Sequence, residues 1–338
     1  MKIGVILLNF GEPEQPNERD VVPFLERIFA TNALLEGDVS REQARARSAE
    51  LARRRAPSLI EMYERIGGSP LNAQARAQAT ALQTELVRRG HDAVVQAAMQ
   101  FTEPSIAVVV QRVRWEGVRR LVGLPVYPLC GESTTVAALA SLERTVADEE
   151  WDIGLTQVSG WHTHPFYTEL RAAGIRRLVA RNDLDLADGA TLVFSAHGTP
   201  VRYLLEGSRY DLYVRDSCSR IAEAAGIARY VIGYQNHTNR PVEWTQPEIG
   251  DVVRTLDAES IVVLPVSFMH EQSETLAELD IDLREVAESA GMRFFRVPIP
   301  HDDPRFAQVL GDVVEGALQD ELSSCRCRVG AGCLAANV

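Results

Sequence analysis

The segment SIVVLPVSFMHEQSETLAELDID, residues 260–282, decides the fold because one kind of element gives way to another within it. Its first six residues, 260–265, form a β-branched apolar run of the length of a buried strand. From Met269 onward, polar side chains recur at helical spacing. A strand that leads into a helix is the repeating unit of a parallel α/β sheet.

The same alternation recurs along all 338 residues, enough for two domains. Helical periodicity is clear in 72–89, 214–226 and 304–321, and strands are predicted at 3–9, 93–99, 119–124, 153–158, 190–196, 229–234, 260–265 and 292–297. We therefore predict an α/β protein of two Rossmann-like lobes, each with a parallel four-stranded sheet flanked by helices and with the active-site cleft between them. The predicted units are an N-terminal lobe, 1–160, a C-terminal lobe, 161–320, and a cysteine-rich tail, 321–338.

The overall composition restricts the class of protein. The net charge of −12 argues against nucleic-acid binding, which needs a basic surface. No apolar run approaches the roughly 20 residues of a membrane span. Met1 and Lys2 lead directly into a strand-length run rather than a signal peptide. These features predict a soluble, cytoplasmic protein, and they leave monomer and homodimer equally open.

Polar, aromatic, glycine and proline residues gather just after the predicted strands. The clearest cases are Phe10-Gly11, 125–128, His197-Gly198, 234–237 and 265–274. Ligands of open parallel sheets bind beyond the carboxyl ends of the strands. The functional site is therefore expected at this edge, between the lobes.

The segment FSAHGTP, residues 194–200, places His197 immediately after a buried strand. An imidazole there can bind a metal or move a proton near neutral pH, and Gly198 allows the backbone to approach a ligand closely. A histidine that only caps the strand end by hydrogen bonds fits the same pattern.

The segment MHEQSETLAELDID, residues 269–282, is rich in carboxylates. If it is helical, Glu271, Glu274 and Glu278 share one face, and such a row can carry a cation or accept protons. A solvated acidic face at a helix start is the plainer interpretation.

The segment LPVYPLCGESTTVA, residues 124–137, predicts a helix N-cap at Ser133, Thr134 and Thr135. Such an N-terminus either binds an anion or only caps the helix. No G-x-G-x-x-G follows a predicted strand, and neither a P-loop nor a G-x-S-x-G turn is present.

Taken together, these motifs resemble those of the ferrochelatases. FSAHGTP is similar to the family signature in which a strand delivers histidine into the porphyrin cleft, and residues 265–281 are similar to a second signature, with Glu274 matching its essential glutamate. The resemblance covers nearly the whole chain in order, with further matches at 7–14, 54–74, 97–106, 124–135, 161–167 and 234–244.

The resemblance implies insertion of Fe²⁺ into a porphyrin with release of two protons, in the final steps of haem biosynthesis. Protoporphyrin IX is favoured as the partner molecule over coproporphyrin III, and iron is a substrate. The implied catalytic residues are His197 and Glu274, which should face each other across the cleft. With Glu278, they are also the implied metal-contacting residues.

The resemblance also implies a set of porphyrin-binding residues, among which Arg55 would hold a propionate; the set is Phe10, Arg55, Tyr63, Tyr127 and Trp244. The apolar stretch 24–35 is expected to form a hydrophobic lip, with burial in the core as the alternative. An exposed lip would also favour peripheral contact with a membrane.

Three positions depart from the family pattern. Gln272 stands where a histidine commonly neighbours the glutamate, Gln100 where an arginine is usual, and Phe10 where Met, Leu or Tyr is more familiar. The absence of an imidazole at position 272 affects the expected path of proton release, and it leaves the assignment of His197 and Glu274 unchanged.

The tail segment CRCRVGAGC, residues 325–333, resembles the C-terminal cysteine cluster of those ferrochelatases that carry a two-iron, two-sulfur cluster. Such clusters take four thiolates, so Cys325, Cys327 and Cys333 need a fourth ligand, and Cys130 is the expected one rather than Cys218. A zinc site and a metal-free tail are the alternatives.

Three other functions are compatible with parts of the pattern. They are another class II chelatase, such as one that inserts cobalt into sirohydrochlorin, a non-catalytic porphyrin- or haem-binding module, and a two-lobed metal-binding protein of periplasmic type. The pair of signatures argues against the first, and the absence of a signal peptide argues against the last.

Overall fold

The chain folds around two four-stranded, all-parallel sheets in a computed structural model that describes residues 1–35, 40–236 and 242–319. The first sheet has the order β2-β1-β3-β4 and the second β6-β5-β7-β8. The strands are β1 (Ile3–Asn9), β2 (Ala93–Met99), β3 (Arg120–Pro125), β4 (Gly154–Gln157), β5 (Ala190–His197), β6 (Tyr230–Gln235), β7 (Ser260–Pro265) and β8 (Arg293–Arg296). The predicted fold class is confirmed, and every predicted strand lies within one residue of its observed bounds.

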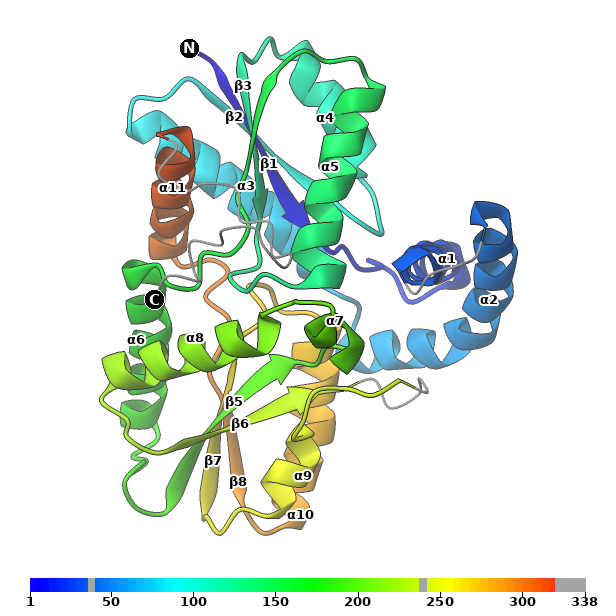
Figure 1. The fold of residues 1–338 in the computed structure, drawn as a ribbon. Coiled ribbons are helices and arrows are strands. Elements are labelled where there is room, and N and C mark those ends of the chain that lie inside the picture. Colours follow the sequence, from blue (N-terminus) through cyan, green and yellow to red (C-terminus); the bar gives the residue numbers. More distant parts are fainter. Residues whose placement is uncertain (36–39, 237–241, 320–338) are drawn as a thin grey trace.

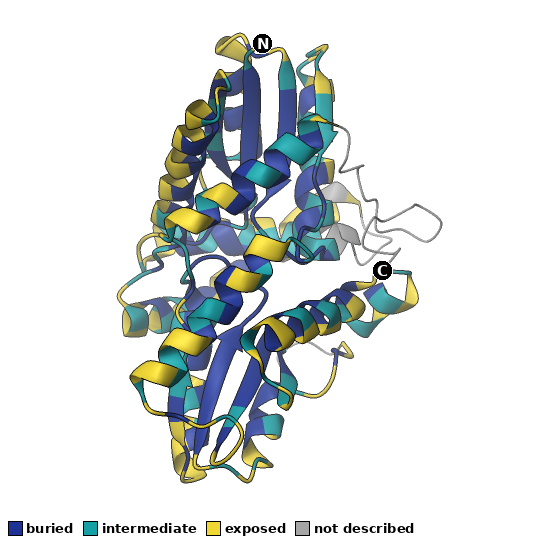
Figure 2. Ribbon diagram, turned by 90° about the vertical axis from the view of Figure 1, so that its left-hand side faces the viewer, coloured by how far each residue is buried: buried dark blue, intermediate teal, exposed yellow. Residues whose placement is uncertain are grey.

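Helices cover both faces of each sheet (Figure 1). Strands β1 and β7 are buried at every position, as expected of central strands that are covered on both faces. Figure 2 shows the central strands of both sheets largely in the buried colour and exposed residues on the outer sides of the helices. The helices are α1 (Glu18–Leu35), α2 (Arg41–Ile66), α3 (Leu71–Arg88), α4 (Ile106–Trp115), α5 (Ala137–Asp148), α6 (Pro165–Arg181), α7 (Val201–Leu205), α8 (Tyr210–Ala225), α9 (Ile249–Arg254), α10 (Arg284–Ser289) and α11 (Pro304–Leu318).

The two sheets repeat one design. In the parallel pairings of the central strands, Leu8 lies opposite Pro125 in the first sheet and Ser195 opposite Pro265 in the second. Phe10 lies two residues after Leu8, and His197 lies two residues after Ser195. Phe10 and His197 therefore occupy corresponding positions in the two sheets. A π-helix follows each of the two matching strands, η1 (Glu132–Val136) after β3 and η2 (Glu274–Leu283) after β7.

The predicted N-cap cluster is wrong, because its residues lie inside the π-helical turn η1. Gly131 occupies the N-cap position and no side chain caps the turn. The Thr134 hydroxyl contacts the Gly131 carbonyl at 3.5 Å, and the Thr135 hydroxyl donates to the Leu129 carbonyl at 3.4 Å. These hydroxyls therefore bind preceding carbonyl groups instead of the backbone N–H groups that a cap would satisfy.

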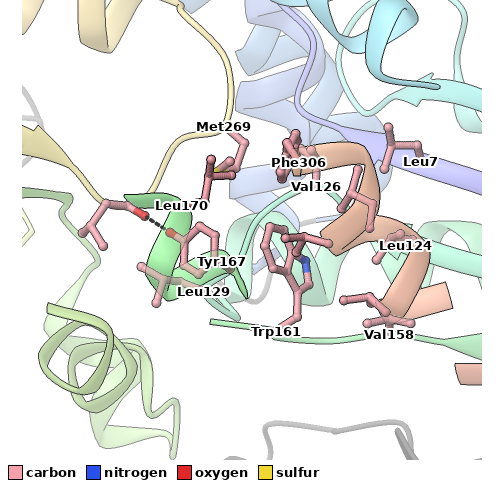
Figure 3. Packing of buried hydrophobic residues seen from close by; sticks show 14 of the residues in the cluster. Leu7, Leu124, Val126, Leu129, Val158, Trp161, Tyr167, Leu170, Met269 and Phe306 are labelled. Atoms are coloured by element: carbon pink, nitrogen blue, oxygen red, sulfur yellow. Dashed lines mark hydrogen bonds between the residues drawn. The ribbon is translucent and has the colours of Figure 1, made fainter. Parts of the chain in front are cut away.

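The lobes share a continuous core. Trp161, Tyr167, Met269 and Phe306 lie in one apolar cluster that includes strand residues of both sheets (Figure 3). The Tyr167 hydroxyl donates to the Val266 carbonyl at 3.4 Å. The division of the chain at residue 160 stays a prediction.

Helix α11 strengthens the junction, because it packs on both α3 and α6 (Figure 1). The Arg89 guanidinium, just after α3, pairs with Asp312 and Glu315 of α11 at 2.6 and 2.7 Å. The last element of the described chain therefore fixes the first lobe to the second.

Helices α1 and α2 pack on each other beside the two sheets (Figure 1). Phe24 and Leu25 are 5% and 7% exposed and belong to a cluster with Phe101 and Tyr63. The expected hydrophobic lip is therefore wrong for these two residues, and the alternative of core burial applies to them. Among the described helices, none combines the length and the apolar composition needed to cross a membrane.

Candidate active site

The loop after β1 and the start of η2 meet where the carboxyl ends of the two sheets face each other. Glu12 belongs to the first loop and Ser273 immediately precedes η2. The Ser273 backbone N–H donates to Glu12 Oε2 at 3.2 Å, and the Ser273 hydroxyl is hydrogen bonded to Glu12 Oε1. The interlobe cleft predicted from the strand ends is thus bridged by side chains from both lobes.

Glu12 is a buried carboxyl that the sequence did not single out, and it is 3% exposed. Burial, and next to it the charge of Glu274, raises the Glu12 pKa to about 7. A carboxylate directly after Phe10-Gly11, at the end of a buried strand, was the available signal.

Glu274 and Glu278 are brought together by η2 and by one side chain from β6. The Gln235 amide nitrogen donates to the Glu274 carbonyl at 3.0 Å and to Glu278 Oε2 at 2.8 Å. Burial, with the charge of Glu274 as the second cause, raises the Glu278 pKa to about 8. Glu274 Oε2 accepts from the Gln272 amide at 2.9 Å and from the Ser273 hydroxyl at 2.8 Å.

Glu271 does not join these carboxylates, so the predicted common face of three glutamates is wrong. It precedes η2, and its carboxylate accepts from Arg296 at 3.0 Å, from the Ile299 backbone N–H at 3.1 Å and from the Thr275 hydroxyl at 2.8 Å. The prediction assumed a regular α-helix from residue 271, whereas the helix begins later and is π-helical.

His197 is the last residue of β5, and its backbone is fixed by neighbours in the second lobe. Its backbone N–H donates to the Ser267 hydroxyl oxygen at 3.0 Å. Its Nδ1 atom lies 2.6 Å from the Gly198 carbonyl oxygen. Because a carbonyl only accepts, the ring hydrogen belongs on Nδ1 and the neutral imidazole carries its lone pair on Nε2.

The strand pairing places His197 beside the glutamine that binds the carboxylates. His197 lies opposite Gln235 in the pairing of β5 with β6, and the Gln235 amide binds Glu274 and Glu278. At Gly198, a Cβ atom would lie 1.9 Å from the Asn236 amide oxygen, so only glycine fits there. One glutamine thus separates the histidine from the acidic pair.

Aromatic residues from the first lobe surround the carboxylates. Burial raises the pKa values of Tyr63 and Tyr127 well above 10, and the charges of Glu12 and Glu274 raise both further. Phe10 follows β1, and its ring packs on Phe101 with 4.5 Å between ring centroids. The predicted residues Phe10, Tyr63 and Tyr127 are therefore all close to the bridged loops.

Arg55 and Trp244 are more remote from these contacts. Arg55 is exposed on α2. Trp244 is 8% exposed and forms a backbone bridge with Pro200, which follows His197 by three residues. Neither has a hydrogen bond to the carboxylates among those identified in the described residues.

The cysteines fall into two groups. Cys130 and Cys218 are buried, and burial raises the Cys218 pKa well above 9. Cys325, Cys327 and Cys333 lie outside the described residues, so the predicted cluster of thiolates has no location here. Within the described part of the chain, no three His, Cys, Asp or Glu side chains are grouped to hold a metal ion.

Comparison with known proteins gives a consistent result. The family model described as ferrochelatase matches residues 2–318. A protein named ferrochelatase from Synechococcus sp. (strain JA-3-3Ab) is 38% identical over 315 residues, which cover 90% of each chain. The ferrochelatase of Synechococcus elongatus is 35% identical, with 94% of this chain and 83% of the relative covered, and that of Gloeobacter violaceus is 33% identical, with 87% and 91% covered.

Two solved structures share the fold. CbiX, described as the terminal enzyme for siroheme biosynthesis in denitrifying bacteria, has a TM-score of 0.53 at 16% identity and covers 94% of this chain and 99% of its own. SirB from Bacillus subtilis with Fe³⁺ has a TM-score of 0.54 at 10% identity, with 95% and 97% covered. At such low identity these two likenesses concern the fold alone.

Proposed function

Because the chain belongs to the ferrochelatase family and is thus an enzyme of haem biosynthesis, we propose that it inserts Fe²⁺ into protoporphyrin IX, with coproporphyrin III as the alternative substrate. The resemblance seen in the sequence motifs is confirmed at the level of the family. The observation that carries the proposed mechanism is the pair Glu274 and Glu278, joined by Gln235 directly beside His197.

Metal insertion places two demands on the site. The porphyrin loses two N–H protons while its four nitrogens bind Fe²⁺, so the reaction needs a proton acceptor and a path for the metal. A flat macrocycle hides its nitrogen lone pairs, and binding energy that distorts it exposes them. Groups that accept protons and a group that meets the metal should therefore lie close to the macrocycle centre.

The glutamates suit the role of proton acceptor. A general base works best when its pKa is near the working pH, and the Glu278 pKa of about 8 meets that condition. Glu274 takes a proton from the porphyrin side, and Glu278, held by the same glutamine, receives the next. Direct contact of Glu274 and Glu278 with the metal stays a prediction.

His197 suits the approach of the metal. Its Nε2 atom carries the lone pair, because Nδ1 is directed at the Gly198 carbonyl. A neutral imidazole is a good ligand for Fe²⁺ on its way to the macrocycle. In this assignment the metal and the leaving protons use different residues.

The porphyrin would lie against the aromatic residues of the cleft. Phe10 and Tyr127 are partly exposed and suit direct contact, whereas Tyr63 and Trp244 are 1% and 8% exposed and would need a local opening. Arg55, exposed on α2, is proposed to hold a propionate. We further propose a cytoplasmic enzyme, monomeric or homodimeric, that makes peripheral contact with a membrane.

A two-iron, two-sulfur cluster on Cys130, Cys325, Cys327 and Cys333 is proposed as well, because these cysteines supply the four thiolates that such a cluster takes. Helix α11 ends against the strand that leads to Cys130: the Arg120 guanidinium of β3 donates to the Leu318 carbonyl at 2.6 Å. Cys325 follows Leu318 by seven positions in the sequence, which corresponds to at most about 25 Å of fully extended chain.

The substrate is tested by an anaerobic insertion assay with Fe²⁺ and three tetrapyrroles side by side: protoporphyrin IX, coproporphyrin III and sirohydrochlorin. The proposal predicts rapid insertion into protoporphyrin IX and slow insertion into sirohydrochlorin. Faster insertion into coproporphyrin III would identify that porphyrin as the substrate, and the proposed reaction, insertion of Fe²⁺ into a porphyrin, would be unchanged. Insertion only into sirohydrochlorin, or into none of the three, would overturn the proposed function.

A further inference from the structure

We propose that Glu12 is a positioning residue for Glu274, acting across the lobe boundary through Ser273. This inference deepens the proposed function, on which it rests, since Glu274 is the proton acceptor assigned there. The chain of contacts runs from Glu12 Oε1 to the Ser273 hydroxyl and from that hydroxyl to Glu274 Oε2.

Glu12 is held rigidly before it reaches the other lobe. Gly11 has φ +81°, and a Cβ atom there would lie 2.3 Å from the Thr102 hydroxyl oxygen, so the turn that presents Glu12 requires glycine. Asn72 of α3 binds both backbone groups: its side-chain oxygen accepts from the Glu12 N–H at 3.1 Å, and its amide donates to the Glu12 carbonyl at 2.8 Å. The Ser69 hydroxyl donates to Glu12 Oε2 at 2.5 Å.

Ser273 transmits this rigidity to Glu274. Glu12 contacts Ser273 at both the backbone N–H and the hydroxyl, and this double contact fixes both groups of the serine. The same hydroxyl lies 2.8 Å from Glu274 Oε2, and the only other side-chain hydrogen bond identified to that carboxylate, among the described residues, comes from Gln272. One of the two side chains that orient the Glu274 carboxylate is therefore itself held from the opposite lobe.

The single hydrogen of the Ser273 hydroxyl indicates that this chain of contacts does more than hold the two lobes together. One serine hydroxyl has one hydrogen, yet it lies between two carboxyl groups. One of these carboxyls must carry a proton to complete the row of hydrogen bonds, which agrees with the raised Glu12 pKa. A hydrophobic pair would hold the lobes together without burying a carboxylate, which is costly.

The test compares three variants with matched controls. Glu12 is hydrogen bonded to the Ser69 hydroxyl and to both groups of Ser273. A protonated Glu12 donates to the Ser273 hydroxyl oxygen, and the NH₂ group of a glutamine would do the same, so the test uses Glu12→Met, which removes every hydrogen bond of the side chain at similar length. Ser273→Ala removes the hydroxyl, and Ser273→Thr retains it. Arg65→Ala is the control, because it breaks the exposed 2.8 Å ion pair with Asp282, a contact between the lobes that does not reach Glu274.

The measurements are kcat for Fe²⁺ insertion, the porphyrin Kd from fluorescence quenching, and Tm. We expect Glu12→Met and Ser273→Ala each to lower kcat by about ten-fold or more, the loss typical of a displaced catalytic group, with Kd nearly unchanged. The double variant should lose no more than the single ones, since both break one chain of contacts. Ser273→Thr should restore most of kcat, and Arg65→Ala should leave it unchanged.

Equal kcat in Glu12→Met and wild type, or a multiplicative loss in the double variant, would overturn the inference. A fall in Tm without a fall in kcat would do the same, because it would leave Glu12 a purely structural contact. Glu274→Gln, measured in parallel, keeps the two proposals apart. If it retains turnover, the proposed function of Glu274 fails; if it loses turnover while Glu12→Met does not, only the inference on Glu12 fails.

Discussion

The Gln235 amide nitrogen lies 2.8 Å from Glu278 Oε2 and holds the charged form of that carboxyl inside a mostly buried environment. Two opposing effects therefore act on Glu278. Burial and the charge of Glu274 raise its pKa, and the hydrogen bond from Gln235 lowers it. The pH dependence of the enzyme should respond to the balance between them.

Replacing Gln235 should move the acidic limb of the rate profile. In Gln235→Met the hydrogen bond to Glu278 is lost, its pKa rises further, and the acceptor stays protonated to higher pH. The acidic limb of kcat against pH should therefore shift to higher pH. Ser195→Ala is the control, because it removes the hydroxyl that binds the other end of the Gln235 amide and leaves the bond to Glu278. An unchanged dependence of kcat on pH in Gln235→Met would show that Glu278 does not accept protons during turnover.

Glu278 should also make the protein less stable as the pH rises. Its pKa is about 8 in the folded state against 4.5 for a solvated glutamate, so between these values the folded state binds more protons than the unfolded state. The free energy of unfolding then falls with rising pH, by up to about 1.4 kcal/mol per pH unit for each such carboxyl. Denaturant titrations from pH 4.5 to 8 should show a shallower fall in Glu278→Gln. An equal slope in both proteins would contradict the assignment.

Glu271 should be important for stability rather than for turnover. Its partner Arg296 has a side chain only 9% exposed, and it also binds Asp280 at 2.6 Å. Glu271→Gln weakens one buried charged pair and should lower the free energy of unfolding by about 2 kcal/mol. The kcat of the folded variant should stay close to that of the wild type. A large loss of kcat without a loss of stability would contradict this and give Glu271 a role in catalysis instead.

The visible absorption of the protein tests whether the tail cysteines bind an iron–sulfur cluster. Protein prepared without oxygen should show the charge-transfer absorption of thiolate-bound iron and sulfide. Serine in place of Cys325, Cys327, Cys333 or Cys130 should abolish it, whereas Cys218→Ser is the matched control and should keep it, since Cys218 is a buried residue of α8. Colourless protein without bound iron and sulfide would show that these cysteines hold no such cluster.

The fold was predictable from the sequence, because each strand is a short β-branched run and its partners follow at regular spacing. The strand ends also located Phe10, His197 and Glu274. The register that puts Gln235 between His197 and Glu278 was not predictable, because it depends on the pairing of β5 with β6. Nor was the separation of Glu271 from Glu274, since the residue spacing gave no sign of a π-helix in place of an α-helix.

Glu12 was missed for a different reason. A carboxylate in a loop after a glycine is usually solvated, and only the contact with the other lobe shows that this one is buried. The segment 24–35 was misread in part because an apolar helix that packs on α2 has the same composition as an exposed lip.

The most direct test of the central claim is anaerobic single-turnover insertion of Fe²⁺ into protoporphyrin IX by the wild type, His197→Ala and Glu274→Gln. The wild type should form haem far faster than the uncatalysed reaction, and each variant should lose most of that rate, typically 10²-fold or more for a general base, while the porphyrin Kd and Tm stay near the wild-type values. Near-normal haem formation in either variant would contradict the account.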